Sequence, residues 1–93
     1  MNIHVLGFYK FKKISNFERN KIQIKNKFFD KSVRGNIIIS PEGINGTISG
    51  KKQNINECIN YIKKIFFIKK FDSTNLSKIN YHLNHLFLAI QKI

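Results

Sequence analysis

The residues best suited to chemistry or binding lie in one short segment near the middle of the chain. They carry hydroxyl, carboxyl or amide groups, or they shape the backbone, and they are Ser40, Pro41, Glu42, Gly43, Asn45, Gly46 and Thr47. Serine, proline and glycine at positions one, two and four of Ser-Pro-Glu-Gly are typical of a type I turn, and Asn-Gly tolerates positive φ. We therefore predict an elaborate connection between two strands, a loop that presents polar atoms to a substrate or to another domain.

A second candidate site follows directly and concerns phosphate. The sequence Gly-Thr-Ile-Ser-Gly-Lys-Lys at 46–52 is similar to a P-loop, but its spacing is one residue short, and Lys52 replaces the Ser or Thr that binds magnesium. This excludes a nucleotidase loop. Glycine and two lysines before a helix still offer N–H groups and positive charge to an anion. Lys51 and Lys52, together with Lys10, are candidate phosphate contacts, with an ordinary strand-to-helix turn as the alternative.

Other reactive residue types give no catalytic or metal site. His82 and His85 have no Cys, Asp or Glu close by in the sequence, so we predict no metal there. Cys58 lies on an apolar stripe without basic neighbours at helical spacing and is expected to be a buried, unreactive thiol. Glu42 is as consistent with a solvated turn as with a contact to RNA or a domain. We assign no catalytic residue and no cofactor to this chain.

Aromatic residues of the first predicted strand suggest a further possibility. Phe8 and Tyr9 resemble the base-stacking platform of an RNA-recognition module, but the segment at 47–49 carries no aromatic partner. Alternation along a strand sends the two rings to opposite faces, so at least one is expected in the core. The segment at 10–13 also lacks the arginine and glycines of an acylphosphatase loop, so that activity is not expected.

The elements that must position these residues follow from hydrophobic patterns. Residues 3–11 and 36–40 are rich in β formers, Ser15–Glu18 forms a capping box before a helix that runs to about Phe29, and the polar stretch at 72–85 is interpreted as loop. A stripe with helical spacing predicts a second helix, and it comprises Ile55, Cys58, Ile59, Ile62, Ile65 and Phe66. Residues 86–93 are predicted to form the last strand.

The predicted order is βαββαβ, which indicates one α+β domain over residues 1–93 with the ferredoxin-like arrangement. In that arrangement a four-stranded antiparallel sheet carries both helices on one face. A chain of 93 residues with 42% hydrophobic content suffices for one core. No apolar run approaches the ~20 residues of a membrane span, and the start lacks the pattern of a secretory signal. A single cysteine excludes an internal disulfide, so we expect a cytoplasmic protein without membrane contact.

The charge balance points to polyanions. The chain has 17 basic and 5 acidic residues, a net charge of +12, which makes nucleic acid the first partner to consider. Almost all basic residues are lysines, and Lys, Ile and Asn share A/T-rich codons, so genome composition is an equally good explanation.

Beyond these patterns, two segments resemble a known family. Phe-Tyr-Lys-Phe at 8–11 and the run from Gly35 to Gly50 are similar to the N-terminal domain of bacterial tRNA uridine hydroxylases, the rhodanese-like family also called TrhO or YceA. The resemblance covers about Ile3 to Phe67. It implies a ferredoxin-like domain followed by a rhodanese-like domain whose cysteine is essential, and oxygen-dependent hydroxylation of the tRNA wobble uridine to 5-hydroxyuridine.

Departures from the family pattern shape the expected function. The sequence ends at Ile93, before a rhodanese-like domain, and Cys58 is not the family cysteine. Asn36 follows Gly35 where the family often has arginine, and the last predicted strand is less basic. We expect an N-terminal domain, or a reduced form, that binds tRNA or docks the rhodanese-like catalytic domain and does not hydroxylate alone. The alternatives are a stand-alone basic RNA-binding module and a folded remnant without function.

Overall fold

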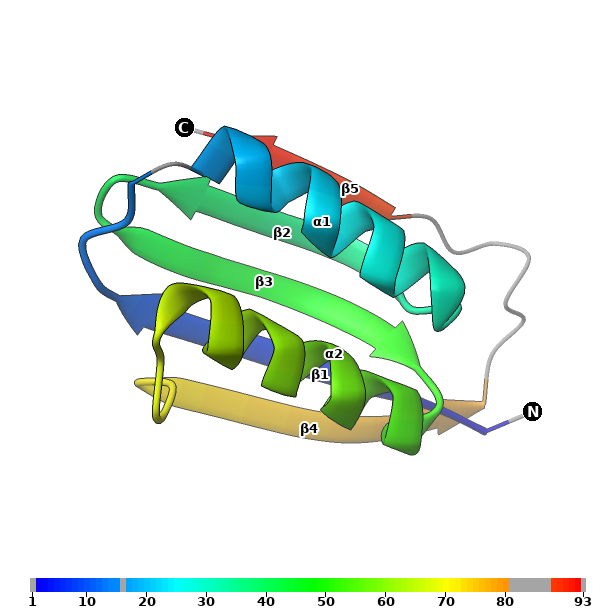
Figure 1. The fold of residues 1–93 in the computed structure, drawn as a ribbon. Coiled ribbons are helices and arrows are strands. Elements are labelled where there is room, and N and C mark those ends of the chain that lie inside the picture. The colour runs from blue at the N-terminus through cyan, green and yellow to red at the C-terminus, as the bar shows by residue number, and fades with distance from the viewer. Residues whose placement is uncertain (1, 16, 81–87, 93) are drawn as a thin grey trace.

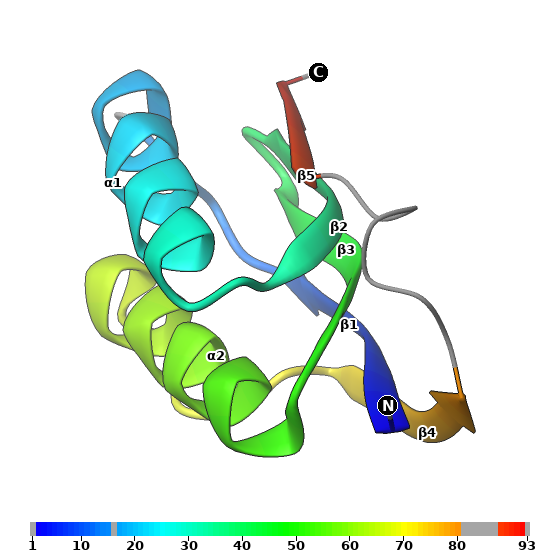
Figure 2. The same cartoon turned by 90° about the vertical axis from the view of Figure 1, so that its right-hand side faces the viewer.

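The chain folds into two layers, a sheet and a pair of helices. A computed structural model describes residues 2–15, 17–80 and 88–92 (Figure 1). Figure 2 shows both helices on one side of the sheet, so that no helix of the described residues lies on the opposite sheet face. The elements in chain order are β1 (Asn2–Phe11), α1 (Phe17–Asp30), β2 (Arg34–Ser40), β3 (Gly43–Gly50), α2 (Lys52–Phe66), β4 (Ser73–Asn80) and β5 (Leu88–Lys92).

The sheet has five strands in the order β4-β1-β3-β2-β5. The first four strands in this order pair antiparallel, and with α1 and α2 they form the predicted ferredoxin-like βαββαβ arrangement, which is confirmed. β5 pairs in parallel with β2 and extends the sheet at its other edge. The last predicted strand therefore exists at 88–92, but it is a fifth strand and not the fourth.

The fourth strand of the arrangement lies where a loop was predicted. β4 occupies 73–80 and pairs with β1 along its whole length, so the interpretation of 72–85 as loop is wrong for these residues. The cause is position: β4 is an edge strand, and residues 73–78 are all exposed. A strand with little buried side-chain surface has no need for alternating apolar residues, so the pattern that reveals other strands is missing. Residues 81–87, and with them His82 and His85, lie outside the described residues.

The core lies between the helices and the sheet. The helical stripe of α2 is confirmed, because Ile55, Cys58, Ile59, Ile62 and Phe66 are all buried. Buried isoleucines of β2 and β3 belong to the same core cluster as this stripe. α1 adds Ile24 and Phe28, both with no exposed surface. Residue 16 lies outside the described residues, so the predicted capping box of α1 is described only in part. Neither helix in the described part of the chain is long and apolar enough to cross a membrane.

The connection between β2 and β3 is shorter than predicted. Only Pro41 and Glu42 separate the two strands, and Ser40 pairs with Gly43. Asn45 and Gly46 lie inside β3, and neither has a positive φ, so the expectation that they belong to the loop between the strands is wrong. The physical reason is the alternation of Ile-Asn-Gly-Thr-Ile: the isoleucines at 44 and 48 are buried, Gly46 lies on the same inner face, and Asn45 and Thr47 face outward.

Candidate functional site

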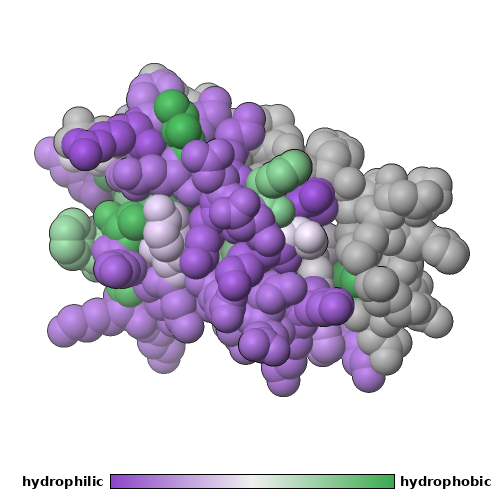
Figure 3. Space-filling view, turned by 45° about the vertical axis from the view of Figure 1, so that its right-hand side comes forward, coloured by the Kyte–Doolittle hydropathy of each residue, from purple (hydrophilic) through white to green (hydrophobic). Residues whose placement is uncertain are grey.

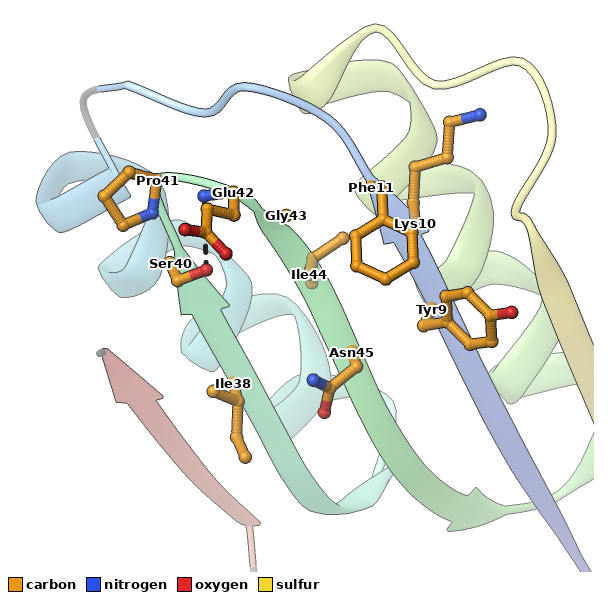
Figure 4. Close-up of a pocket in the computed structure, with 10 residues that line it drawn as sticks. All are labelled: Tyr9, Lys10, Phe11, Ile38, Ser40, Pro41, Glu42, Gly43, Ile44 and Asn45. Carbon is orange, nitrogen blue, oxygen red and sulfur yellow. Dashed lines mark hydrogen bonds between the residues drawn. The ribbon is translucent and has the colours of Figure 1, made fainter.

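The open face of the sheet, the face opposite the helices, carries the candidate site. Figure 4 shows Tyr9 and Phe11 on β1, Asn45 on β3 and Ile38 on β2 projecting from this face. Strand register explains the grouping, because Tyr9 pairs with Asn45 and Asn45 pairs with Ile38. An aromatic ring, an amide and an aliphatic side chain thus form one row across three neighbouring strands.

Two adjoining hollows mark the open face. The larger has a volume of about 560 Å³, and six of its ten lining residues belong to the segment Ser40–Asn45. The smaller, of about 350 Å³, shares Tyr9, Ile38 and Asn45 with it and continues to Gly46 and Thr47. All seven residues of the predicted docking segment therefore line these hollows, although most of them are strand and not loop.

Hydrogen bonds donated by backbone amides hold the turn end of the hollows in place. The amide of Glu42 donates to the hydroxyl of Ser40 at 3.2 Å. The amides of Lys12 and Ile14 donate to the carbonyl oxygens of Glu42 and Pro41 at 2.9 and 3.1 Å. The chain that follows β1 is thus tied to the turn between β2 and β3. These two amides are engaged within the protein and are not free to bind an anion.

Asp72 fastens the end of β1 from the other side. Its carboxylate accepts hydrogen bonds from the amide of Phe11 at 2.7 Å and from the ammonium group of Lys10 at 3.2 Å, and its own amide donates to the carbonyl of Tyr9. The amide of Phe11, and then Lys10, lower the pKa of this carboxyl below its usual value. Lys10, predicted as a phosphate contact, therefore has its charge engaged in an ion pair.

The other two predicted phosphate contacts lie elsewhere. Lys51 and Lys52 are exposed at the start of α2, where Lys51 is the N-cap residue, and the first turn of this helix contains no acidic residue. Figure 1 shows this helix end at the opposite end of β3 from the turn at 41–42. Lys51 lies six positions after Asn45, which corresponds to about 20 Å along a strand. Lys10 lies at the turn end of β3, so the three predicted phosphate contacts do not form one site.

The two sides of the molecule differ in charge. Among the described residues that line the hollows, Lys10 and Glu42 are the charged ones, and both lie at the turn end. The whole chain, by contrast, has 17 basic and 5 acidic residues. Much of the lysine lies on α1, on α2 and in the connections, and the side of the molecule seen in Figure 3 is mostly hydrophilic with a few separate hydrophobic groups.

Three contributors to the site were missed from the sequence. Ser73 and Asn75 line the smaller hollow from β4, and the loop prediction for this stretch hid them. Asp72 had no sequence signal, because its partners Lys10 and Phe11 are more than 60 positions away. The prediction for the aromatic pair, in contrast, is confirmed: Phe8 is buried against Phe71, whereas Tyr9 is exposed beside Phe11.

The remaining reactive group is the thiol of Cys58. It is fully buried in the core, and this burial raises its pKa to about 12, an effect that the positive charge of Lys27 only partly offsets. A thiol with so high a pKa stays protonated near neutral pH and is a poor nucleophile, as predicted. Within residues 2–15, 17–80 and 88–92, no cluster of His, Cys, Asp and Glu side chains could hold a metal ion.

Comparison with known proteins gives sequence relatives for nearly the whole chain. A family model described as UPF0176 acylphosphatase like domain matches residues 3–91. The tRNA uridine(34) hydroxylase of Pelagibacter ubique (strain HTCC1062) is 48% identical over 81 residues, which are 87% of this chain and 27% of that protein. The protein of the same name from the Wolbachia of Brugia malayi is 35% identical over 69 residues, 74% of this chain and 26% of that protein. This chain therefore spans about a quarter of their length.

Solved structures show the same fold at low sequence identity. The BLUF protein BlrB matches with a TM-score of 0.65 at 11% identity, over 98% of this chain and 72% of that one. An acylphosphatase from Coxiella burnetii matches with a TM-score of 0.59 at 10% identity, over 99% of this chain and 93% of that one. Identities this low show a shared fold alone.

Proposed function

Because the chain belongs to the family of UPF0176 acylphosphatase-like domains, we propose that it serves tRNA modification. In this proposal it is the N-terminal domain, or a reduced form, of a tRNA wobble-uridine hydroxylase. Support comes from relatives that are named tRNA uridine(34) hydroxylase and are 48% and 35% identical. The chain spans 27% and 26% of these proteins. Its own contribution to tRNA modification therefore depends on the surfaces that it can offer to a partner.

The main structural support for the proposal is the position of the segment Ser40–Thr47. This segment, which lies within the run that resembles the family, lines two hollows on the open face of the sheet. Reversing the chain between β2 and β3 requires only the two residues of the segment that separate these strands. Its polar groups at Asn45 and Thr47 instead point outward from the middle of β3.

The role of this chain is binding. Its thiol is buried and protonated, and its carboxylates at Asp72 and Glu57 are engaged with Lys10 and Lys31, so they are poorly placed as bases. Lysines outside the open face contact the RNA backbone, and the exposed pair Lys51 and Lys52 does so at the start of α2, where free helix amides add to the attraction for phosphate. Lys10 contributes less, because Asp72 holds its charge.

Deleting the gene and measuring 5-hydroxyuridine in total tRNA tests this function. We expect the modified nucleoside to fall, and an unchanged level would overturn the assignment. The purified 93-residue protein is expected to bind tRNA without hydroxylating it in the presence of oxygen. Turnover by the purified protein would overturn the binding-only role.

The net charge of +12 favours a second candidate, a stand-alone basic RNA-binding module. This candidate predicts tRNA affinity that falls steeply with salt and a 5-hydroxyuridine level that does not respond to deletion. It also predicts little effect from replacing Glu42 or Asn45, because a lysine surface does not depend on them. A loss of function in either variant would favour the hydroxylase assignment.

A further inference from the structure

We propose that the open face of the sheet, which carries few charged residues, is a protein-docking surface. Its occupant is the part of the tRNA-modifying enzyme that the longer relatives carry beyond the segment matched here. This inference rests on the proposed function and adds the surface and the nature of the partner.

The first argument is the composition of the face. Tyr9 and Phe11 are 41% and 74% exposed, although both are large aromatic side chains, and their rings contact edge to face with centroids 5.5 Å apart. Ile38 continues the apolar strip on β2, and Asn45 and Thr47 supply hydrogen-bonding groups between them. Aromatic enrichment and depletion of lysine and glutamate are what distinguish the buried centre of a protein interface.

The second argument is charge, and it favours protein over RNA. A surface that binds RNA through its backbone places lysine or arginine along the groove. Among the described residues that line the hollows, the one cation is Lys10, which is paired with Asp72, and the anion Glu42 would repel phosphate. The whole chain has 17 basic residues, so this face has far fewer basic residues than the rest of the molecule.

The third argument is size. Four strands spaced ~4.8 Å apart, each contributing about seven residues at ~3.3 Å, give a face of roughly 450 Å², or about 900 Å² counted on both partners. This is small for a stable complex of separate chains but typical of interfaces between domains of one chain. The matched relatives are such longer chains, since the aligned segment is only 27% and 26% of their length.

Thiol labelling of a full-length chimera tests the inference. The 81 residues of this chain that align with the Pelagibacter ubique relative replace the matching segment of that protein. A single cysteine is then placed by Asn45→Cys or, as a matched control on the exposed side of α1, by Gln23→Cys. Cys58 gives little background because it is buried with a raised pKa, and cysteines of the relative react equally in both variants. Both variants are also made in the 93-residue chain.

In the 93-residue chain both introduced thiols should react at similar rates. In the chimera the Asn45→Cys thiol should react at least tenfold more slowly, with the Gln23→Cys rate unchanged. Equal rates for Asn45→Cys in the two proteins would overturn the inference, and protection that appears only after tRNA is added would replace the protein occupant with RNA. Protection combined with an unchanged 5-hydroxyuridine level after deletion would instead overturn only the proposed function.

Two variants of opposite charge at position 45 provide a second test, in case a cysteine variant does not fold. Asn45→Lys and Asn45→Glu are each expected to lower the thermal stability of the chimera while leaving that of the 93-residue chain nearly unchanged, because either charge would be buried at the interface. If the face bound RNA, lysine would strengthen and glutamate would weaken tRNA affinity. Opposite effects of this kind on tRNA affinity, with stability unchanged, would overturn the inference.

Discussion

Tyr9 on β1 lies directly across from Asn45 on β3 in the antiparallel ladder of the sheet. The pair places an exposed aromatic ring beside an outward-facing amide on two neighbouring inner strands of the sheet, and both residues line both hollows. Because a strand ladder and not a loop sets this geometry, the pair is held rigidly. A rigid, uncharged pair at the centre of an open face is well suited to bind a partner, and the predictions below test what holds it and what it does.

The clamp at the end of β1 depends on Asp72. We expect Asp72→Ala to lower the urea midpoint of unfolding, because the amide of Phe11 and the ammonium group of Lys10 both lose their acceptor. The pKa of Asp72 is lowered in the folded state. Its stabilising contribution is therefore present above the unfolded pKa of about 4 and is lost as the pH falls through the lower folded value.

Urea unfolding between pH 2 and 7 measures this contribution. The wild type should lose stability toward acid more steeply than Asp72→Ala, and the decline that remains in the variant comes in part from Glu57, whose pKa is lowered by its hydrogen bond to Lys31. Asp30→Ala, at the exposed end of α1, is the control. Identical acid profiles for the wild type and Asp72→Ala would contradict the clamp.

The turn at the end of the hollows requires glycine at 43. Its φ is +159°, and a Cβ atom there would overlap the carbonyl oxygen of Lys10 on β1. We expect Gly43→Ala to cost about 2–4 kcal/mol of unfolding free energy, since backbone would have to move. Gly7→Ala is the matched control, because a Cβ there would meet its nearest atoms at 3.9 and 4.0 Å, ordinary contact.

Chemical denaturation of the two glycine variants gives the comparison. Gly7→Ala should stay within about 1 kcal/mol of the wild type and could exceed it, because alanine restricts the unfolded chain. Equal losses in both variants would mean that the close approach of β1 and β3 at Lys10 does not limit position 43.

The buried thiol should make stability sensitive to alkali. The pKa of Cys58 is raised to about 12 in the folded state, whereas an unfolded cysteine titrates near 8.5. Its contribution is complete below about pH 8.5 and is lost as the pH rises toward the folded value. Between pH 7 and 10 the wild type should lose about 2 kcal/mol more than Cys58→Ala, as measured by urea unfolding. Parallel losses would indicate that the thiol is hydrated.

The lysines at the start of α2 should act on tRNA more than lysines elsewhere. We expect the double variant Lys51→Ala and Lys52→Ala to reduce the slope of log affinity against log salt by about 1–2, because each neutralised phosphate contributes somewhat less than one unit. The control is Lys63→Ala with Lys64→Ala, which removes the same charge from the last turn of α2. Titrations at several salt concentrations measure both slopes. If the two slopes fell equally, the attraction would be a general effect of net charge.

Much of the fold could be predicted because elements with a buried face carry apolar residues at regular spacing in the sequence. The stripe of α2 and the runs at 3–11 and 36–40 face a core on at least one side, and these elements appear where expected. β4 could not be found in this way, because its described side chains are exposed and its pairing with β1 is a matter of backbone hydrogen bonds. Five strands in place of four follow from the same cause.

Seven residues of the candidate site were predicted from the sequence, but their secondary structure was not. The seven residues of the docking segment do meet at one surface, yet the alternation of buried Ile44 and Ile48 with exposed Asn45 and Thr47 makes most of them strand. Lys51 was predicted as a phosphate contact together with Lys10, and β3 carries it to the opposite end of that strand from the turn (Figure 1). Contacts between distant parts of the chain, such as Lys10 with Asp72, leave no local signal at all.

The amount of 5-hydroxyuridine in tRNA, measured by mass spectrometry in complemented deletion strains, tests the central claim most directly. The account predicts that the deletion lowers the nucleoside, that the wild-type gene and the surface control Gln23→Lys restore it, and that Asn45→Lys does not. Unaltered 5-hydroxyuridine in the deletion strain, or full restoration by Asn45→Lys, would contradict the account.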